Sequence, residues 1–147
     1  MAESNVLFKE LLADEEFRKA FPVIKQLRPH LDEEKFLNLT KNMQGEGYRM
    51  FALFADEQIV SVTGIIQLTN FYDGKHIWVN DLVTVENQRS KGYGKMLLSF
   101  VVKLAEESDC EMVVLSSNFE RVKAHKFYLE KMGFAKTSYV FKKQLRG

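Results

Sequence analysis

A short basic loop with two glycines, residues 89–94, constrains the fold of this chain most. A strand-like run at residues 78–85 precedes it, and a helix-like run at residues 95–107 follows it. Gly92 and Gly94 permit unusual φ values and close backbone approach, while the free N–H groups of the first helical turn attract an anion. Three basic side chains add positive charge there: Arg89, Lys91 and Lys95. The pattern is typical of a phosphate-binding loop, and it also occurs as a purely structural turn.

Two well-known phosphate loops do not match this segment. The dinucleotide-binding fingerprint needs a third glycine where this chain has Leu97. The P-loop needs Gly-Lys-Ser/Thr, whereas Lys95 is followed here by Met96. A nucleotide-binding domain of either kind is therefore disfavoured.

The composition indicates one globular domain without a general affinity for anionic polymers. The 147 residues fit a single domain, 1–147, and 46% hydrophobic with 28% charged residues is ordinary for a soluble protein. Because 21 Lys and Arg face 20 Asp and Glu, we expect neither nucleic acid nor a membrane as a partner. An anion site must therefore be local.

The cysteine count and the hydropathy pattern point to the cytoplasm. Cys110 is the single cysteine, so no disulfide forms within the chain, which fits a reducing compartment. No run approaches the ~18 apolar residues of a membrane span, and residues 1–5 lack the layout of a signal peptide. We therefore expect a cytoplasmic protein.

The hydrophobic pattern predicts the element order β-αα-βββ-α-β-α-β. Six strands are expected, at residues 6–11, 48–55, 58–68, 75–85, 110–116 and 138–145. Four helices are expected, at residues 14–26, 32–44, 95–107 and 120–132. A right-handed crossover between the fourth and fifth strands makes these two strands parallel in an otherwise antiparallel sheet. The expected fold is α+β, with a mixed sheet between helices in three layers.

Two motifs in this order resemble the GNAT superfamily of acyl-CoA-dependent N-acyltransferases. The family's central motif is Gln/Arg-x-x-Gly-x-Gly/Ala between a strand and a helix, and Arg89, Gly92 and Gly94 match it in register. The second match is residues 124–134, where a helix carrying Phe-Tyr is followed by a Gly-Phe turn. The resemblance is clear from residue 48 onward, and the helices before it match by element order.

The resemblance implies acetyl-CoA as co-substrate, and we expect no metal. The pyrophosphate would bind the backbone N–H groups of residues 90–95, and the pantetheine arm would pair with residues 82–84 like an extra strand. A bulge near residues 82–85 is expected to splay the fourth and fifth strands and leave that edge open. The cofactor-binding residues expected are Leu82, Val83, Thr84, Arg89, Ser90, Lys91, Gly92, Tyr93, Gly94, Lys95, Asn118, Arg121 and Tyr128.

Two of these residues depart from the family pattern. Many relatives have an asparagine about two turns before the tyrosine, whereas this chain has Arg121 there and an asparagine at Asn118. Arg121 is either a coenzyme A contact or a surface residue. His125 lies on the same helical face as Tyr128, where packing is its expected role.

Tyr128 matches the family tyrosine that is proposed to protonate the departing sulfur. Reference pKa values of ~10 for tyrosine and ~8.5 for a thiol make this proton transfer uphill by only about 2 kcal/mol. The alternative is a helix tyrosine that only packs. For the oxyanion, a backbone N–H near Val83 or Thr84 is the expected donor.

The sequence does not identify the general base that removes a proton from the amine. Many relatives carry a glutamate where this chain has Asn80, which cannot accept a proton, and Ser116 at a second position is no base either. Asp81 remains, acting directly or through water, although a structural role is equally open to it.

These residues together indicate an N-acetyltransferase that acts on a primary amine of a small molecule, peptide or protein. Direct transfer in a ternary complex is favoured, because Cys110 has an acidic neighbour and no evident histidine partner. An acyl-CoA-binding module without turnover is the alternative, motivated by Asn80. The acceptor pocket is expected near residues 28–44 and 70–74, the acceptor itself is not selected, and a homodimer is an open alternative.

Overall fold

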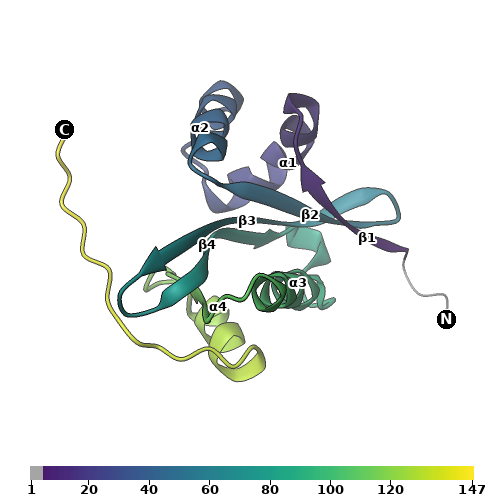
Figure 1. The fold of residues 1–147 in the computed structure, drawn as a ribbon. Helices are drawn as coiled ribbons and strands as arrows, with labels where there is room; N and C mark the ends of the chain where they lie inside the picture. Colours follow the sequence, from purple (N-terminus) through teal and green to yellow (C-terminus); the bar gives the residue numbers. More distant parts are fainter. Residues whose placement is uncertain (1–4) are drawn as a thin grey trace. The chain divides into compact units, whose positions relative to one another are not determined.

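The structure is a computed structural model that describes residues 5–147. Two compact units divide the chain, Met1–Leu115 and Ser116–Gly147. The first unit carries the sheet and three helices, and the second carries a short helical segment and the C-terminal end of the chain (Figure 1). The expectation of one domain over residues 1–147 stays a prediction.

Five strands form one mixed sheet in the first unit, in the order β1-β2-β3-β4-β5. The first four strands pair antiparallel, and β5 pairs parallel with β4, as the sequence predicts. The strands are β1 (Val6–Leu11), β2 (Arg49–Ala55), β3 (Gln58–Asn70), β4 (Gly74–Thr84) and β5 (Met112–Leu115).

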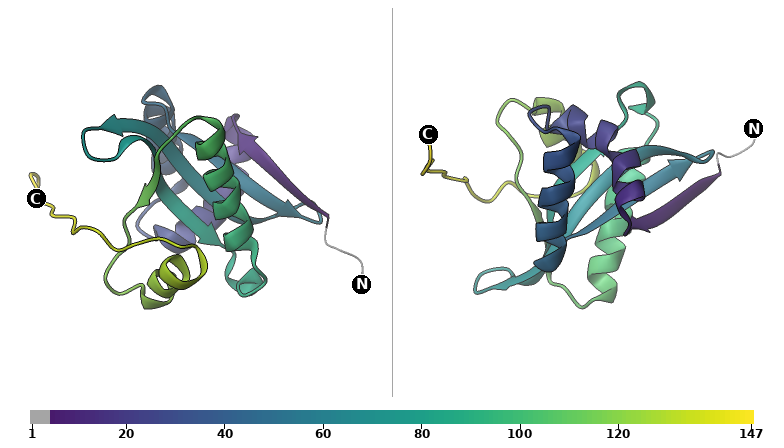
Figure 2. Two further views of the ribbon diagram at one scale, coloured as in Figure 1. Left: turned by 60° about the horizontal axis from the view of Figure 1, so that its bottom comes forward. Right: turned by 90° about the horizontal axis from the view of Figure 1, so that it is seen from above.

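Helices cover both faces of this sheet and give three layers. α1 (Asp14–Leu27) and α2 (Glu33–Gly45) lie on one face, and α3 (Tyr93–Glu107) lies on the other (Figure 2). The core under α1 and α2 includes Phe21, Phe36 and Val83, while α3 buries four apolar side chains at helical spacing, Leu97, Leu98, Val101 and Ala105. The mixed α+β fold expected from the sequence is confirmed.

The helix starts follow local capping chemistry. Asp32 precedes α2 and its side chain accepts a hydrogen bond from the Lys35 N–H at 2.8 Å, as expected of an N-cap. At α1 the N-cap is Ala13, which has no side-chain acceptor, and Glu16 takes over by accepting from the N–H groups of Leu12 and Ala13. None of the helices in residues 5–147 is long and apolar enough to cross a membrane.

A β-bulge in β4 lies at Asn80, two residues before the expected position at residues 82–85. Gly64 of β3 pairs with Asp81 and Ile65 pairs with Val79, which leaves Asn80 without a partner. Because neighbouring residues of a strand point to opposite faces, the insertion places Val79 and Asp81 on opposite faces of the sheet. The bulge thus re-aims Asp81 toward α1 and α2.

The far end of β4 has an open edge. Pairing with β5 covers only His76–Val79, whereas β4 continues to Thr84. The Val85 N–H donates to the Val60 carbonyl, so by the alternation of an antiparallel ladder the backbone groups of Val83 face β3 and those of Leu82 and Thr84 face away from it. This is the splay between the fourth and fifth strands that the sequence predicts.

The second unit contains α4 (Val122–Lys126) and a π-helical turn, η2 (Phe127–Lys131). The expected helix at residues 120–132 therefore starts later and changes its winding. The expected last strand at residues 138–145 is wrong for this structure, in which residues 134–147 carry no strand. A strand needs partners for its N–H and C=O groups, and sequence alternation alone does not provide them.

Candidate active site

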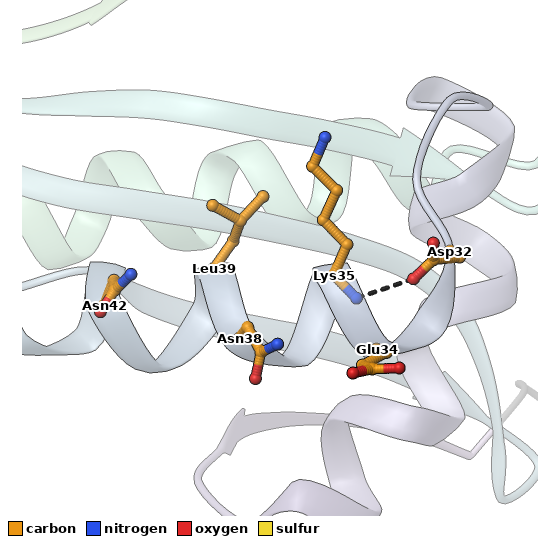
Figure 3. A pocket seen from close by; sticks show the side chains of 6 residues that line it. All are labelled: Asp32, Glu34, Lys35, Asn38, Leu39 and Asn42. Carbon is orange, nitrogen blue, oxygen red and sulfur yellow. Dashed lines mark hydrogen bonds between the residues drawn. The ribbon is translucent and has the colours of Figure 1, made fainter.

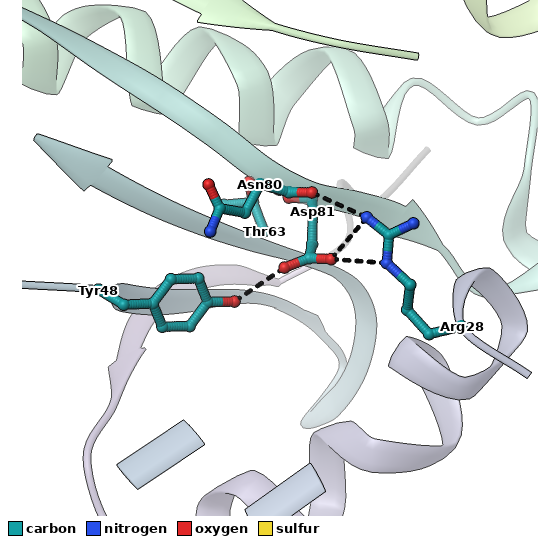
Figure 4. A network of polar contacts seen from close by, with 5 residues as sticks. All are labelled: Arg28, Tyr48, Thr63, Asn80 and Asp81. Carbon is teal, nitrogen blue, oxygen red and sulfur yellow. Dashed lines mark hydrogen bonds and ion pairs between the residues drawn. The ribbon is translucent and has the colours of Figure 1, made fainter. Parts of the chain in front are cut away.

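Asp81 is the centre of a polar network on the α1 and α2 side of the sheet (Figure 4). Arg28, the C-cap residue of α1, donates to Asp81 Oδ1 through Nε at 3.2 Å and forms an ion pair with it through Nη2 at 3.1 Å. Tyr48 Oη donates to Oδ2 at 3.0 Å. The Asp81 side chain is only 12% exposed. It is therefore a carboxylate held in one orientation by donors from two other segments.

The backbone of the bulge is fixed by the same network. Arg28 Nη2 donates to the Asn80 carbonyl at 3.0 Å, and Thr63 Oγ1 donates to the Asp81 carbonyl at 2.8 Å. A bulge disrupts the regular ladder, so the guanidinium of Arg28 supplies a partner at the point where strand pairing is irregular. The side chain and the backbone at Asp81 are thus positioned together.

Tyr48 is buried, and its hydroxyl is a hydrogen-bond donor in this site. Burial raises the pKa of Tyr48 well above its usual value, and the negative charge and hydrogen bond of Asp81 raise this pKa further. A Cβ atom at Gly64 would lie 1.6 Å from Tyr48 Oη, so the tyrosine fits only because position 64 has no side chain. The neutral phenol therefore serves as a fixed donor to Asp81.

A cavity of about 200 Å³ adjoins this network and has Asp81, Arg28 and Tyr48 in its wall. Its other walls come mainly from α1, α2, the connection between them and β2. Six apolar side chains line it: Ile24, Leu31, Phe36, Leu39, Met43 and Met50. His30 and Thr40 complete the lining. Seven of its eleven lining residues fall in residues 28–44, one of the two stretches near which the acceptor pocket is expected, and none comes from the other, residues 70–74.

A larger hollow, about 340 Å³, is a surface feature of α2 alone (Figure 3). Its six lining residues are Asp32, Glu34, Lys35, Asn38, Leu39 and Asn42. They belong to α2 and its N-cap, and none of the predicted site residues is among them. The smaller cavity, which has Asp81 in its wall, is therefore the candidate acceptor pocket.

The glycine loop forms the N-terminus of α3. Gly92 is the N-cap with φ of 84°, and Ser90 also has a positive φ of 71°. The first helical hydrogen bond runs from the Met96 N–H to the Gly92 carbonyl at 3.0 Å, so the three N–H groups before it have no partner inside the helix. Such a helix N-terminus with free N–H groups suits an anion. The residues present fit the pyrophosphate of coenzyme A.

Gly94 brings this loop close to the open edge of β4. A Cβ atom at Gly94 would lie 3.3 Å from Thr84 Oγ1, a tighter contact than ordinary packing. Arg89 Nε donates to the Thr84 carbonyl at 3.3 Å, and Lys91 Nζ donates to Gln88 Oε1 at 3.0 Å. The structure thus places Thr84, the last residue of β4, against Arg89 and Gly94 of the loop.

The remaining predicted residues lie in the second unit. Asn118 Oδ1 accepts from the Glu120 N–H at 2.9 Å and so closes a turn before α4, of which Arg121 is the N-cap. Tyr128 is buried in η2, with the ring of Phe134 5.9 Å away, and its carbonyl accepts from the Phe134 N–H at 3.0 Å. Tyr128 is therefore held by the Gly-Phe turn that follows it.

Three members of the Asp81 network were not connected with Asp81 from the sequence: Arg28, Tyr48 and Thr63. The signals of Arg28 and Tyr48 were present but weak. Arg28 precedes the proline that marks the end of α1, and Tyr48 follows the Gly-Glu-Gly end of α2 directly. Arg28 falls in the stretch where the acceptor pocket is expected, but its contact with Asp81 and that of Tyr48 span 53 and 33 residues and depend on the tertiary fold.

This combination of a mixed sheet, a splayed edge and a glycine loop agrees with the comparison with known families. The model of the acetyltransferase (GNAT) family matches residues 10–134. The chain therefore belongs to the acetyltransferase (GNAT) family, and the resemblance stated from its two motifs is confirmed.

Several individual proteins are similar to it. "Uncharacterized N-acetyltransferase YhdJ" of Bacillus subtilis (strain 168) is 40% identical over 136 residues, which cover 92% of this chain and 96% of that protein. The aminoglycoside N-acetyltransferase AAC(6')-Iy, solved in complex with CoA, has a TM-score of 0.84 at 16% identity and coverage of 99% and 98%. Glucosamine-6-phosphate N-acetyltransferase from Arabidopsis thaliana has a TM-score of 0.72 at 21% identity and coverage of 95% and 99%. At these identities the two solved structures show the fold.

Proposed function

We propose that this protein transfers an acetyl group from acetyl-CoA to a primary amine of a small molecule or peptide, directly in a ternary complex. The observation that carries the proposal is the open edge of β4 beside the glycine loop, with the Asp81 cavity on the same strand. Family membership and the CoA complex of AAC(6')-Iy support coenzyme A as the carrier. The names of the aminoglycoside and glucosamine-6-phosphate enzymes support a small amine as acceptor.

Coenzyme A would be held by backbone groups rather than by side chains. The Thr84 N–H and the Leu82 carbonyl face outward and would serve the two amides of the pantetheine arm, as an added strand would require, while the Thr84 carbonyl already accepts from Arg89 Nε. Residues 90–95 offer the free N–H groups of the α3 N-terminus to the pyrophosphate. When bound, the co-substrate supplies the acetyl thioester. Arg89 and Lys91 contribute positive charge at the same loop.

The oxyanion donor follows from the strand register. As the amine attacks the thioester carbonyl, negative charge develops on the carbonyl oxygen, and a backbone N–H must donate to it. The Val83 N–H is directed at β3, whereas the Thr84 N–H faces the open edge. Of the two residues named from the sequence, Val83 is thereby excluded, and Thr84 lies about 10 Å along the strand from Asp81. The Leu82 N–H faces the same open edge beside Asp81 and is therefore the proposed donor.

Asp81 is proposed to accept the proton that the amine loses. Its Oδ1 receives two donors from Arg28, while Oδ2 receives only Tyr48. A carboxylate has about four lone-pair sites, which leaves one on Oδ2 for the N–H of an amine or for a bridging water. Tyr128 is proposed as the group that gives a proton to the departing sulfur. Asn118 and Arg121 are proposed to bind coenzyme A from the second unit.

The test of this proposal is a thiol-release assay with acetyl-CoA and a broad panel of amines. We expect thiol to appear in a one-to-one ratio with acetylated amine for at least one class. Binding of acetyl-CoA, followed by isothermal titration calorimetry, is the parallel measurement. If acetyl-CoA binds and no small amine, aminoglycoside or peptide releases thiol, the acyl-CoA-binding module without turnover is the better description.

A further inference from the structure

We infer that the acceptor is a compact primary amine with an apolar body, which enters the cavity between α1, α2 and β4 with its nitrogen at Asp81. This inference rests on the proposed acetyl transfer and adds the chemical class of the acceptor. It separates this protein from enzymes whose acceptors are polycationic aminoglycosides or phosphorylated sugars.

The lining of the cavity is the first argument. Beyond the polar network, its floor consists of buried apolar side chains, among them Ile24, Phe36 and Met50. At the rim, His30 is exposed and polar, whereas Leu39, which is 40% exposed, continues the apolar floor outward. A hydroxyl-rich or charged acceptor would lose its hydration against these groups without gaining hydrogen bonds. An alkyl or aralkyl body would gain from their burial.

The charge balance of the cavity is the second argument. Asp81 is the one carboxylate in the lining, and Arg28 forms an ion pair with it at 3.1 Å. A polycation needs several negative groups, and a phosphate needs a free cation. Here Asp81 and Arg28 already compensate each other, and His30 is the one further basic side chain of the lining. A net neutral pair favours one neutral amine, which is also the nucleophilic form.

The size of the cavity is the third argument. Its volume of about 200 Å³ lies below the ~300–1,000 Å³ of pockets that hold drug-sized ligands. A short alkyl chain or a single aromatic ring on a short linker is the appropriate scale. An aminoglycoside has several linked rings and exceeds it.

The first experiment measures kcat/KM for a homologous series at saturating acetyl-CoA. With ~0.8 kcal/mol gained per buried CH₂, each methylene from ethylamine through butylamine to hexylamine should raise kcat/KM about fourfold until the cavity is filled. Phenethylamine should be a good acceptor, and sisomicin, spermidine and glucosamine 6-phosphate should be poor ones. Better turnover of these polar amines, with no dependence on chain length, would overturn the inference and leave the proposed acetyl transfer standing.

A pair of variants locates the effect in the cavity. Leu39→Lys places a charge at the cavity rim, on an exposed position of α2 where it should not unfold the protein. Asn38→Lys adds the same charge to an exposed neighbouring position that lines only the outer surface of α2. We expect Leu39→Lys to lower kcat/KM for hexylamine at least tenfold and Asn38→Lys to leave it unchanged. Equal effects of the two variants would contradict the assignment.

A binding readout keeps the inference testable if no amine turns over. Hexanol has the same chain and cannot be acetylated on nitrogen, so its binding reports on the cavity alone. Chemical-shift changes on titration with hexanol should cluster at Met43, Phe36 and Leu39 and should be weakened by Leu39→Lys. Hexanol binding without turnover of any amine would contradict the proposed acetyl transfer and support the apolar acceptor cavity. Turnover of amines without hexanol binding would support the acetyl transfer and contradict the apolar acceptor cavity.

Discussion

The hydroxyl of Tyr48 occupies the space that a side chain at position 64 would need. This close packing links three residues, because Gly64 leaves room for Tyr48, and the Tyr48 hydroxyl then orients Asp81 through its hydrogen bond. Glycine in a strand is otherwise unfavourable, since it packs nothing and loses conformational freedom on folding. Its presence opposite Asp81 is thus explained by close approach rather than by an unusual φ.

Gly64→Ala is therefore expected to destabilise the protein. The added Cβ would displace the Tyr48 ring, and such overpacking in a core costs ~1–3 kcal/mol. Urea unfolding monitored by circular dichroism measures the loss. Gly45→Ala is the control, because a Cβ there meets nothing within 4 Å and α2 should be as stable or more stable. Equal stability of the two variants would show that Tyr48 adapts at no cost.

At the scale of elements, α3 and β4 meet at the glycine loop in a way that the sequence predicted well. Glycine is needed at the two positions for different reasons: Gly92 has a positive φ, and Gly94 lies too close to Thr84 for a side chain to fit easily. Periodicity and the Gly-x-Gly spacing were sufficient to place this junction. The bulge was predicted near residues 82–85, two residues after its actual position at Asn80. No local sequence signal marks which residue of a strand is left unpaired.

Gly92→Ala should weaken the binding of coenzyme A about tenfold. An alanine at positive φ is strained by ~1–2 kcal/mol, and relieving the strain turns the free N–H groups away from the pyrophosphate, whose charge-assisted hydrogen bonds contribute ~1.5–3 kcal/mol each. Isothermal titration calorimetry measures the affinity. Gly47→Ala is the matched control, with φ of 101° and only an ordinary contact for a Cβ, 3.9 Å from Ile66 Cγ1. Both variants should lose stability, and only Gly92→Ala should lose affinity.

Glu16, at the N-terminus of α1, should make the free energy of unfolding decrease at acidic pH. The side-chain hydrogen bond from Lys9, followed by the backbone N–H groups of Ala13 and Leu12, lowers the pKa of Glu16 from 4.5 to about 2. As the pH falls, the unfolded chain therefore binds the proton first. The stabilisation from Glu16 is complete above the unfolded pKa of 4.5 and is lost as the pH falls toward about 2.

Glu16→Gln should remove this part of the pH dependence. Urea midpoints compared at about pH 7 and about pH 3 should fall less for this variant than for the parent protein. Glu15→Gln removes the same charge from the same helical turn at an exposed position, and it should keep the parent's dependence. A parent-like slope in Glu16→Gln would contradict the assignment.

At the scale of the whole molecule, periodic sequence patterns predicted most helices and strands. The contacts between distant residues depend on the tertiary structure and were not predicted. The α+β class and the parallel neighbour β5 followed from the order of the elements, because a crossover helix allows few topologies. Arg28 and Tyr48 could not be assigned to Asp81 in this way, since their contact depends on the register of β4 against β3. The strand expected at residues 138–145 has the right alternation but no partner in the structure, and alternation does not identify a partner.

Kinetics can separate a role of Tyr128, in the second unit, in the chemistry from a role in coenzyme A binding. Tyr128→Phe keeps the ring that packs beside Phe134 and removes only the hydroxyl. If this hydroxyl protonates the departing sulfur, kcat should fall about 100-fold, as for loss of a general acid, with the Kd of acetyl-CoA unchanged. Tyr139→Phe, at an exposed position, is the control and should leave kcat unchanged. An unaltered kcat in Tyr128→Phe would remove Tyr128 from the mechanism, and a joint loss of kcat and affinity would assign it to coenzyme A binding instead.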